Sequence, residues 1–373
     1  MIRKTVLATA LAAIAAAPGL ASAQAAAPTL DKVLEASGIS LSGYIDAGYT
    51  HANKNVETAF STRVFDSQNN SFLLHQVGLQ IAKQPKEGFG GLVNITVGKD
   101  AQVIPSYDNA TSGSQFDVTQ AFGQYASGNM TLMAGKFVTL QGTEVIWSPA
   151  NPNASRSILF GAIPFTHTGV RSVWAFSDMF SFTAGLNNGW DQLKDSNNSK
   201  TLELGTTITP IKPLIIVVSY YTGKETVPQA VPGNPDGKRT SLNAVATYTV
   251  SDPLTLGVEI LSVSQENFVS LVTGSPIKAK YSGLAFYLTY TMSPKWRAVG
   301  RFESFKDDDG FRFGTADTKY DEFTLTGAYL PSTSVELRAE LRRDSADRAV
   351  FVETGGTTSK TLMTYALQAL YKF

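Results

Sequence analysis

The sequence predicts an all-β protein, a transmembrane antiparallel up-and-down β-barrel of about 16 strands. Three observations predict it. Apolar and polar residues alternate in stretches of about ten residues, turn-forming residues separate the stretches, and only 17% of the chain is charged. Alternation is expected because successive strand side chains point to opposite faces, here lipid and lumen. Closure is expected because a bilayer offers no water to satisfy an open sheet edge.

Residues 1–23 have the organisation of a cleaved signal peptide. A positively charged start and an apolar stretch over residues 6–17 precede Ala-Ser-Ala at 21–23, the small residues that signal peptidase accepts. The mature chain is then expected to begin at Gln24. An uncleaved membrane anchor is the alternative, but the apolar run is shorter than the roughly 20 residues that a spanning helix needs.

Residues 24–37 form the N-terminal segment of the predicted mature protein, which we place in the periplasm. Apolar residues at 30, 33 and 34 recur at helical spacing after Thr29, a suitable N-cap. This spacing predicts a short helix, either in the barrel mouth or as a lead-in to the first strand. Residues 38–373 are assigned to the barrel.

The first and last strands show the alternation most clearly. From residue 39 onward, Ile45 and its alternate neighbours are apolar, while Asp46 lies on the polar face. From Met363 to Phe373 every second residue is apolar or aromatic. The other candidate strands begin near Phe72, Gly91, Phe116, Met130, Thr168, Phe180, Leu202, Leu214, Ser241, Leu254, Tyr281, Trp296, Glu322 and Val335.

The connections alternate between short and long, which sets the topology. Short turns such as 127–129 and 251–253 are rich in Gly, Ser, Asp and Pro, whereas 224–238 and 306–318 are long and polar. Short turns face the periplasm in bacterial barrels, so both termini lie there and the strand number is even, about 16, or 14 if weak segments merge. Aromatic residues at the short-turn ends predict an interfacial girdle: Phe176, Phe180, Trp296, Tyr329 and Phe373.

The composition excludes several classes of protein. The absence of cysteine removes disulfides, thiolate metal sites and a lipidated anchor. The precursor carries 31 basic and 31 acidic residues, so no basic face points to a nucleic-acid partner. His51, His75 and His167 show no metal-ligand spacing and no catalytic pattern. We therefore expect no metal, no cofactor and no enzymatic activity, and keep an enzyme at the outer rim as the weakest alternative.

Charged residues on the predicted strands indicate a water-filled lumen. On the strand from Val335, charged residues alternate with apolar ones, and an Arg facing lipid near the midplane would cost ~2–4 kcal/mol. These side chains should therefore face inward. They would line a pore and set its selectivity. Alternatively, they would pair with one another without any effect on selectivity. The candidates are Arg171, Glu203, Glu259, Arg297, Arg301, Glu303, Glu336, Arg338, Glu340 and Arg342.

The segment 140–165 is too long for an ordinary turn and alternates poorly. Porins often fold one such loop inward to narrow the channel. We therefore expect this segment to be the constriction, with Glu144 and Arg156 at the narrowest part. The alternative is an extracellular cap.

Two resemblances support this interpretation. The ending Leu370-Tyr371-Lys372-Phe373 resembles the C-terminal signal read by the outer-membrane barrel assembly machinery, with Tyr371 and Phe373 as the aromatic positions. The mature chain also resembles the OmpL-like β-barrel porin family. The matching stretches are Ser42-Gly43-Tyr44-Ile45-Asp46-Ala47, Asn151-Pro152-Asn153, Ser155-Arg156-Ser157, Pro164, Thr168-Gly169-Val170-Arg171 and Asn187-Asn188-Gly189-Trp190-Asp191.

The resemblance implies a porin in the outer membrane of a Gram-negative bacterium, surrounded by outer-membrane lipids. The expected function is passive diffusion of small hydrophilic solutes or ions through a charged lumen. A plugged barrel with a structural or adhesion role through its extracellular loops is the alternative. Many 16-stranded porins are homotrimers, so a homo-oligomer follows by analogy.

Overall fold

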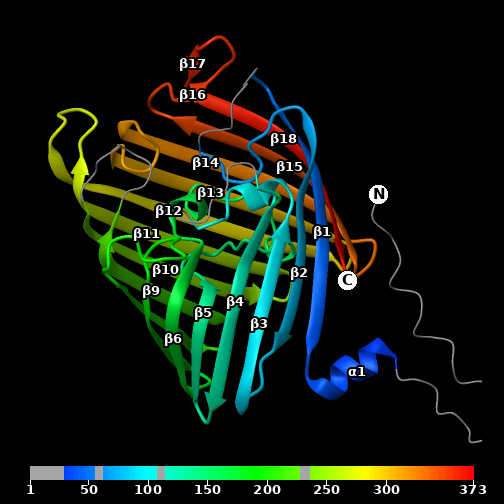
Figure 1. Ribbon diagram of the computed structural model, residues 1–373. Helices are drawn as coiled ribbons and strands as arrows, with labels where there is room; N and C mark the ends of the chain where they lie inside the picture. Colours follow the sequence, from blue (N-terminus) through cyan, green and yellow to red (C-terminus); the bar gives the residue numbers. More distant parts are fainter. Residues whose placement is uncertain (1–28, 55–61, 107–113, 227–235) are drawn as a thin grey trace, which may run out of the picture.

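The structure is a computed structural model that describes residues 29–54, 62–106, 114–226 and 236–373. The predicted signal peptide, 1–23, lies outside the described residues. Sixteen antiparallel strands form a closed barrel (Figure 1). A two-stranded hairpin, β16–β17, lies in the last long loop, between β15 and β18. The barrel strands are β1 (Ser40–Ala52), β2 (Ser71–Lys83), β3 (Gly88–Val97), β4 (Phe116–Ser127), β5 (Met130–Val138), β6 (Thr166–Ser177), β7 (Phe180–Asn187), β8 (Thr201–Ile211), β9 (Leu214–Glu225), β10 (Gly237–Ser251), β11 (Leu254–Val269), β12 (Pro276–Ser293), β13 (Trp296–Asp309), β14 (Ala316–Tyr329), β15 (Val335–Ala346) and β18 (Thr361–Lys372).

The barrel closes by pairing of β1 with β18, so the predicted count of 16 strands is confirmed and the alternative of 14 is wrong. Each strand pairs with its sequence neighbour, and the ladder places Tyr44 opposite Lys372. The terminal Phe373 extends this pairing, because its N–H donates to the Gly43 carbonyl at 2.9 Å. The hairpin strands β16 and β17 cover Phe351–Val352 and Thr358–Ser359.

The predicted short helix is present as α1 (Leu30–Ser37). Thr29 occupies the N-cap position in an extended conformation, but its side chain makes no capping hydrogen bond. The helix ends at Gly38, whose φ of 66° is the left-handed conformation that glycine adopts without strain. None of the helices among the described residues is long and apolar enough to cross a membrane.

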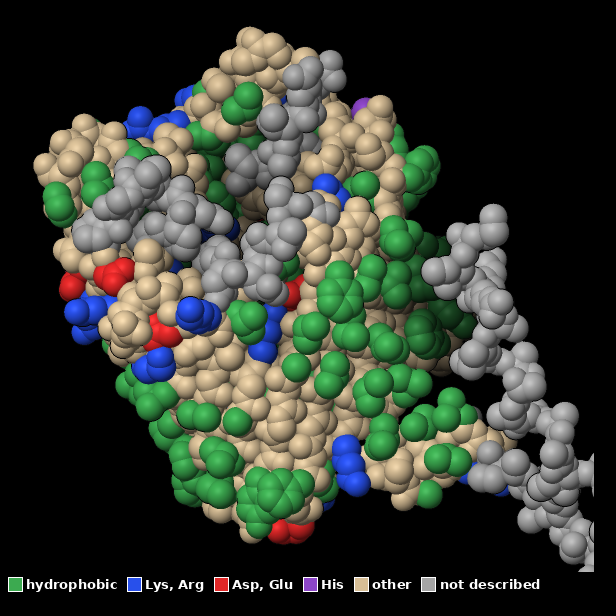
Figure 2. All heavy atoms as spheres, in the orientation of Figure 1, with side chains coloured by type: hydrophobic (Ala, Val, Ile, Leu, Met, Phe, Trp, Pro, Cys, Tyr) green, Lys and Arg blue, Asp and Glu red, His purple; other side chains and the backbone are tan. Residues whose placement is uncertain are grey.

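The two faces of the barrel wall differ as the alternation predicts. On β15, Glu336 and Arg342 are buried in the interior, whereas Leu337 and Arg343 are exposed on the outside. Figure 2 shows hydrophobic side chains over the outer wall, with most charged side chains of this face toward the loop end.

One bulge interrupts the alternation on β2. Asp46 pairs with Gln76 and the next β1 residue pairs with Leu74, which leaves His75 without an opposite residue. The extra residue turns both His75 and Gln76 into the interior, where both are buried. The sequence pattern did not predict this bulge.

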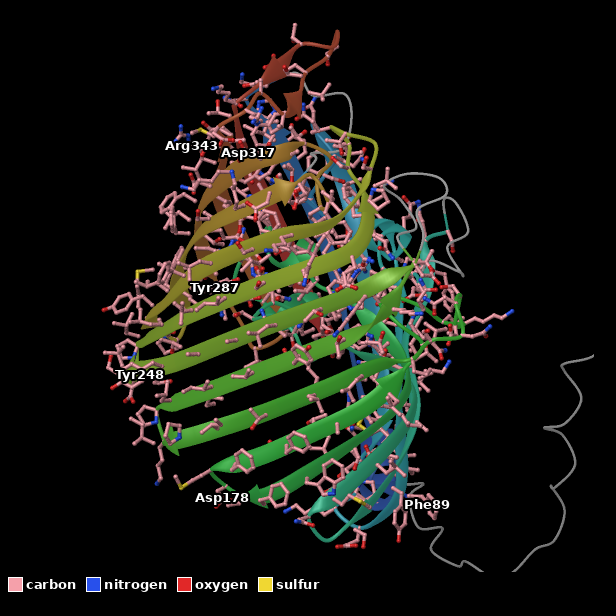
Figure 3. All side chains as sticks on the ribbon, turned by 90° about the vertical axis from the view of Figure 1, so that its left-hand side faces the viewer. Phe89, Asp178, Tyr248, Tyr287, Asp317 and Arg343 are labelled. Carbon is pink, nitrogen blue, oxygen red and sulfur yellow. The ribbon has the colours of Figure 1, made fainter. Side chains whose placement is uncertain are left out.

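The short turns gather at one end of the barrel and the long loops at the other. Figure 3 places Asp178 and Phe89 near the turn end, and Asp317 and Arg343 near the loop end. At the turn end, aromatic rings meet on the outer surface: Phe176 lies 5.7 Å from Phe180, measured between ring centroids. The wall is uneven in height, from 8 residues in β7 to 18 in β12.

Candidate functional site

The connection between β5 and β6, residues 139–165, folds into the barrel (Figure 1); we call it L3. Asn153, Ile158 and Leu159 on L3 have no solvent exposure. Two single-turn 3-10 helices, Ser148–Ala150 and Phe160–Ala162, lie within it. L3 therefore lies inside the barrel rather than over its extracellular mouth.

The first residues of L3 are held by β9, β10 and β11. The backbone N–H groups of residues 140, 142 and 143 donate to Tyr221, Asn243 and Glu259, at 3.0, 3.1 and 2.9 Å. Asn243 and Tyr287 also donate to Glu259, at 2.9 and 3.4 Å, and Tyr287 lies between the two ends of the barrel (Figure 3). Successive backbone groups of the loop are thus fixed to successive strands.

Two buried carboxylates lie on the part of the wall formed by β13, β14 and β15, which we call the far wall. Each accepts hydrogen bonds from two consecutive backbone N–H groups of L3. Glu340 on β15 accepts from residues 154 and 155 at 2.7 and 3.0 Å. Glu303 on β13 accepts from residues 158 and 159 at 2.9 and 3.0 Å. Hydrogen bonds to a charged group contribute about 1.5–3 kcal/mol each, against about 0.5–1.5 for neutral pairs. These carboxylates therefore act as anchors for the loop.

Glu144, one of the two predicted constriction residues, joins L3 to the wall. One carboxylate oxygen accepts from Arg301 on β13 at 2.7 Å, and the other accepts from the Ser157 N–H at 2.7 Å. Arg301 also forms ion pairs with Glu322 and Glu303, at 3.1 and 3.4 Å. Arg301 is thus the central cation among three carboxylates, and it is only 1% exposed.

Arg156, the other predicted constriction residue, is fixed within L3. Its Nε donates to the Val145 carbonyl at 2.9 Å and its Nη2 to the Ile146 carbonyl at 3.2 Å. The guanidinium lies over the rings of Phe65 and Phe160, at 5.4 and 5.8 Å. Its position in L3 is therefore set by the loop itself.

A small cavity lies between L3 and the wall formed by β1, β2 and β18. Arg156, Asp46, His75 and Gln368 are among the residues that line it, and its volume is about 20 Å³. This is room for about one water molecule. On the turn side, Trp147 of L3 packs edge-on against Tyr44, with ring centroids 4.5 Å apart. L3 thus contacts β1 as well as the far wall.

Nine of the ten side chains predicted to line the pore are buried on the inner face of the wall, and the tenth, Arg297, is partly exposed beside Glu336. Most are paired. Arg171 donates to Glu203 at 2.8 Å, and Arg338 donates to Glu336 at 2.7 Å. Arg297 pairs with Glu336, Arg342 pairs with Asp344 at 2.7 Å, and the remaining four contact L3 or one another.

Several residues of the polar network around L3 were missed from sequence. Tyr221, Asn243 and Glu322 lie on inward-facing positions, so alternation gave their direction but not their partners. Arg63 of the first long loop also reaches in and donates to Asp344 and Thr364, both at 2.7 Å. No pattern within that loop indicates this contact.

The three histidines have separate surroundings. His51 is exposed at the loop end of β1, whereas His75 contacts Asp100 with Nδ1 at 3.1 Å. His167 contacts the Gly189 carbonyl at 2.9 Å and stacks on Tyr221 at 4.6 Å. Across the described ranges, no group of three His, Cys, Asp or Glu side chains could hold a metal ion.

A closed barrel of this size with a loop folded into its lumen is the architecture of porins. A comparison of the sequence with known families identifies which family the chain belongs to. Residues 38–373 match the family described as "Putative beta-barrel porin-2, OmpL-like". The chain belongs to this family. The predicted resemblance is therefore confirmed, and the OmpL-like porin is an outer-membrane protein of Gram-negative bacteria.

Solved structures share the fold of this OmpL-like porin at low sequence identity. The outer membrane channel DcaP of Acinetobacter baumannii is 13% identical, with a TM-score of 0.63 over 90% of this chain and 97% of that one. An anion-selective porin from Comamonas acidovorans is 10% identical, with a TM-score of 0.61 over 90% and 99%. OmpT of Vibrio cholerae, in a trimer form, is 13% identical, with a TM-score of 0.57 over 90% and 99%. No curated protein matches the sequence. The family and the fold are those of a channel rather than an enzyme.

Proposed function

We propose that this porin allows passive diffusion of small hydrophilic solutes or ions, and that L3 sets the narrowest part of the path. The observation that carries this proposal is the fixation of L3 across the lumen by inward-facing charged side chains of β11, β13 and β15. A loop anchored at so many points can hold a constriction at a constant width.

Glu144 and Arg156 take different parts in this proposal. Glu144 is 3% exposed and both of its oxygens are engaged, so it holds the loop in place. Arg156 is 2% exposed and donates to the Val145 and Ile146 carbonyls beside the small cavity, so it fixes the fold of L3 itself. The other inward-facing charges, from Arg171 to Arg342, would line the path or hold the loop.

The surroundings of the barrel follow from the same proposal. Tyr371 and Phe373 are about half exposed on the outer face at the chain end, where the barrel assembly machinery and then outer-membrane lipids would contact them. A homo-oligomer is supported by the similarity to OmpT of Vibrio cholerae, which is described in a trimer form.

The direct test is single-channel current from the refolded mature protein in a planar bilayer. Stable current steps are expected, and the reversal potential in a salt gradient gives the ionic preference. Heat-modifiable gel mobility provides the control that the barrel has folded.

One observation favours a second function. The cavity beside Arg156 has a volume of only about 20 Å³, as expected if L3 closes the lumen. The barrel would then be plugged and would act through its extracellular loops. Folded barrels that carry no current would support this second function and contradict the first.

A further inference from the structure

A second, larger cavity lies on the loop side of L3, which forms part of its floor. Its volume is about 420 Å³, and we call it the vestibule cavity. Residues 161–165 of L3, the loop after β7, the start of β10 and the loop after β13 all contribute to its lining. A cavity built by several separate segments can present several side chains to one bound molecule.

Two arginines line the vestibule cavity without a carboxylate partner. Arg239 donates through Nε to the neutral side-chain oxygen of Gln265, at 2.8 Å, and the nearby carboxylates of Glu225 and Asp191 act on its charge through space only, without an ion pair among the described residues. Arg312 has an Nε that is buried and without a hydrogen-bond partner in the part of the chain that the structure describes. Across those same residues, neither guanidinium forms an ion pair. Arg239 is nevertheless only 6% exposed, and a buried cation without a counter-ion is costly.

Aromatic rings surround these guanidinium groups. The Arg239 guanidinium lies 4.8 Å from the ring of Trp190 and 5.3 Å from the ring of Phe311. These are cation–π contacts, and the hydrogen bond to Gln265 uses only Nε, so the two Nη groups can donate to an anion. Phe165 and Ile163 of L3 add apolar surface to the same cavity.

The one carboxylate in the lining is already engaged. An oxygen of Asp191 accepts from the N–H groups of Phe165 and Thr166, at 2.7 and 2.9 Å, and so fixes the end of L3. Asp191 forms no ion pair with Arg239 or Arg312 among the described residues. The lining therefore has two cations, one occupied carboxylate and several apolar walls. The carboxylates of Asp307 and Glu225 lie next to it, and both accept from backbone N–H groups of the surrounding loops.

From this arrangement we infer that the vestibule cavity is a binding site for organic anions that have a planar apolar body, such as aromatic carboxylates. Arg239 and Arg312 bind the carboxylate, since a guanidinium fork matches its two oxygens. Trp190, Phe311 and Phe165 bury the ring. The inference goes beyond diffusion through the lumen, because it assigns a specific site above L3.

The test is calorimetric titration of the folded mature protein with benzoate and with benzamide. The two probes have the same shape, but only benzoate is charged. Benzoate is expected to bind more tightly than benzamide by about tenfold, which corresponds to about 1.4 kcal/mol. Equal affinities, or no benzoate binding, would overturn the inference using the wild-type protein alone.

A double variant, Arg239→Gln with Arg312→Gln, locates the site. It should lose this preference for benzoate, whereas Arg348→Gln, an exposed arginine in the loop after β15, should keep it. A double variant that binds benzoate as the wild type does would also overturn the inference. Since binding is measured without current, a barrel that binds benzoate but conducts nothing would contradict the proposed function and leave this site standing.

Discussion

The far wall of the lumen and the vestibule cavity use charge in opposite ways. At the wall, Arg301 lies among Glu144, Glu303 and Glu322, and the carboxylates that are left over accept backbone N–H groups of L3. In the vestibule cavity, Arg239 makes its hydrogen bond and its ring contacts with neutral groups, and Asp191 and Glu225 act on its charge only through space. Arginines that are ion-paired hold the loop in place. Arginines on the same barrel without an ion pair among the described residues are available to a ligand.

Removing the central cation of the wall should give the largest effect. In Arg301→Met three buried carboxylates lose their shared partner, which should cost about 3–5 kcal/mol of the free energy of unfolding. Urea unfolding in detergent measures this. The control Arg343→Met changes an exposed arginine on β15 and should have little effect. Equal free energies of unfolding for Arg301→Met and Arg343→Met would contradict the claim that Arg301 stabilises the three carboxylates around it.

Weakening the anchors without removing a cation should give an intermediate effect. Glu303→Gln combined with Glu340→Gln leaves each side chain with one acceptor oxygen. Of the four hydrogen bonds to L3, two then become neutral and weaker by about 1 kcal/mol each, and two are lost because an NH2 group cannot accept. L3 should then be cleaved faster in limited proteolysis. Glu266→Gln, at an exposed position of β11, serves as the control. Cleavage at the wild-type rate would mean that other contacts suffice to hold the loop.

A change of pH should give the smallest effect, and only in the vestibule cavity. Burial raises the pKa of Asp191 to about 6, against the opposing effect of its two backbone hydrogen bonds and of Lys136 and Arg239. His167 and Glu225 lie on the neighbouring strands, beside Gly189 and Trp190. Below this pKa Asp191 is neutral and no longer repels an anion, so affinity should fall as the pH rises through it.

Benzenesulfonate is the suitable probe for this pH dependence because its own charge does not change over that range. Its affinity should fall a few-fold between about pH 5 and about pH 7. Asp191→Asn should remove the change. A variant that keeps the full pH dependence would assign it to another group, such as Asp307, which accepts from the backbone N–H groups of Arg312 and Phe313.

Alternation alone predicted the strands, the barrel and the inward direction of residues such as Glu340. Alternation could not predict the hydrogen-bond partners of these residues, since Glu340 binds a backbone group 186 residues away in the chain. Alternation did not predict the bulge at His75 either, because one extra residue leaves the local composition unchanged. The vestibule cavity could not be predicted either. Arg239 and Arg312 come together only where loops from separate hairpins meet.

The most direct test of this account is the single-channel conductance of a barrel in which a short Gly-Ser linker replaces residues 142–163 of L3. A matched variant with a shortened loop at 270–275, which contributes none of the L3 anchors described above, serves as the control. We predict current steps several-fold larger than wild type for the first variant and unchanged steps for the second. Unchanged conductance in a folded barrel without these L3 residues would contradict the claim that L3 sets the width of the path.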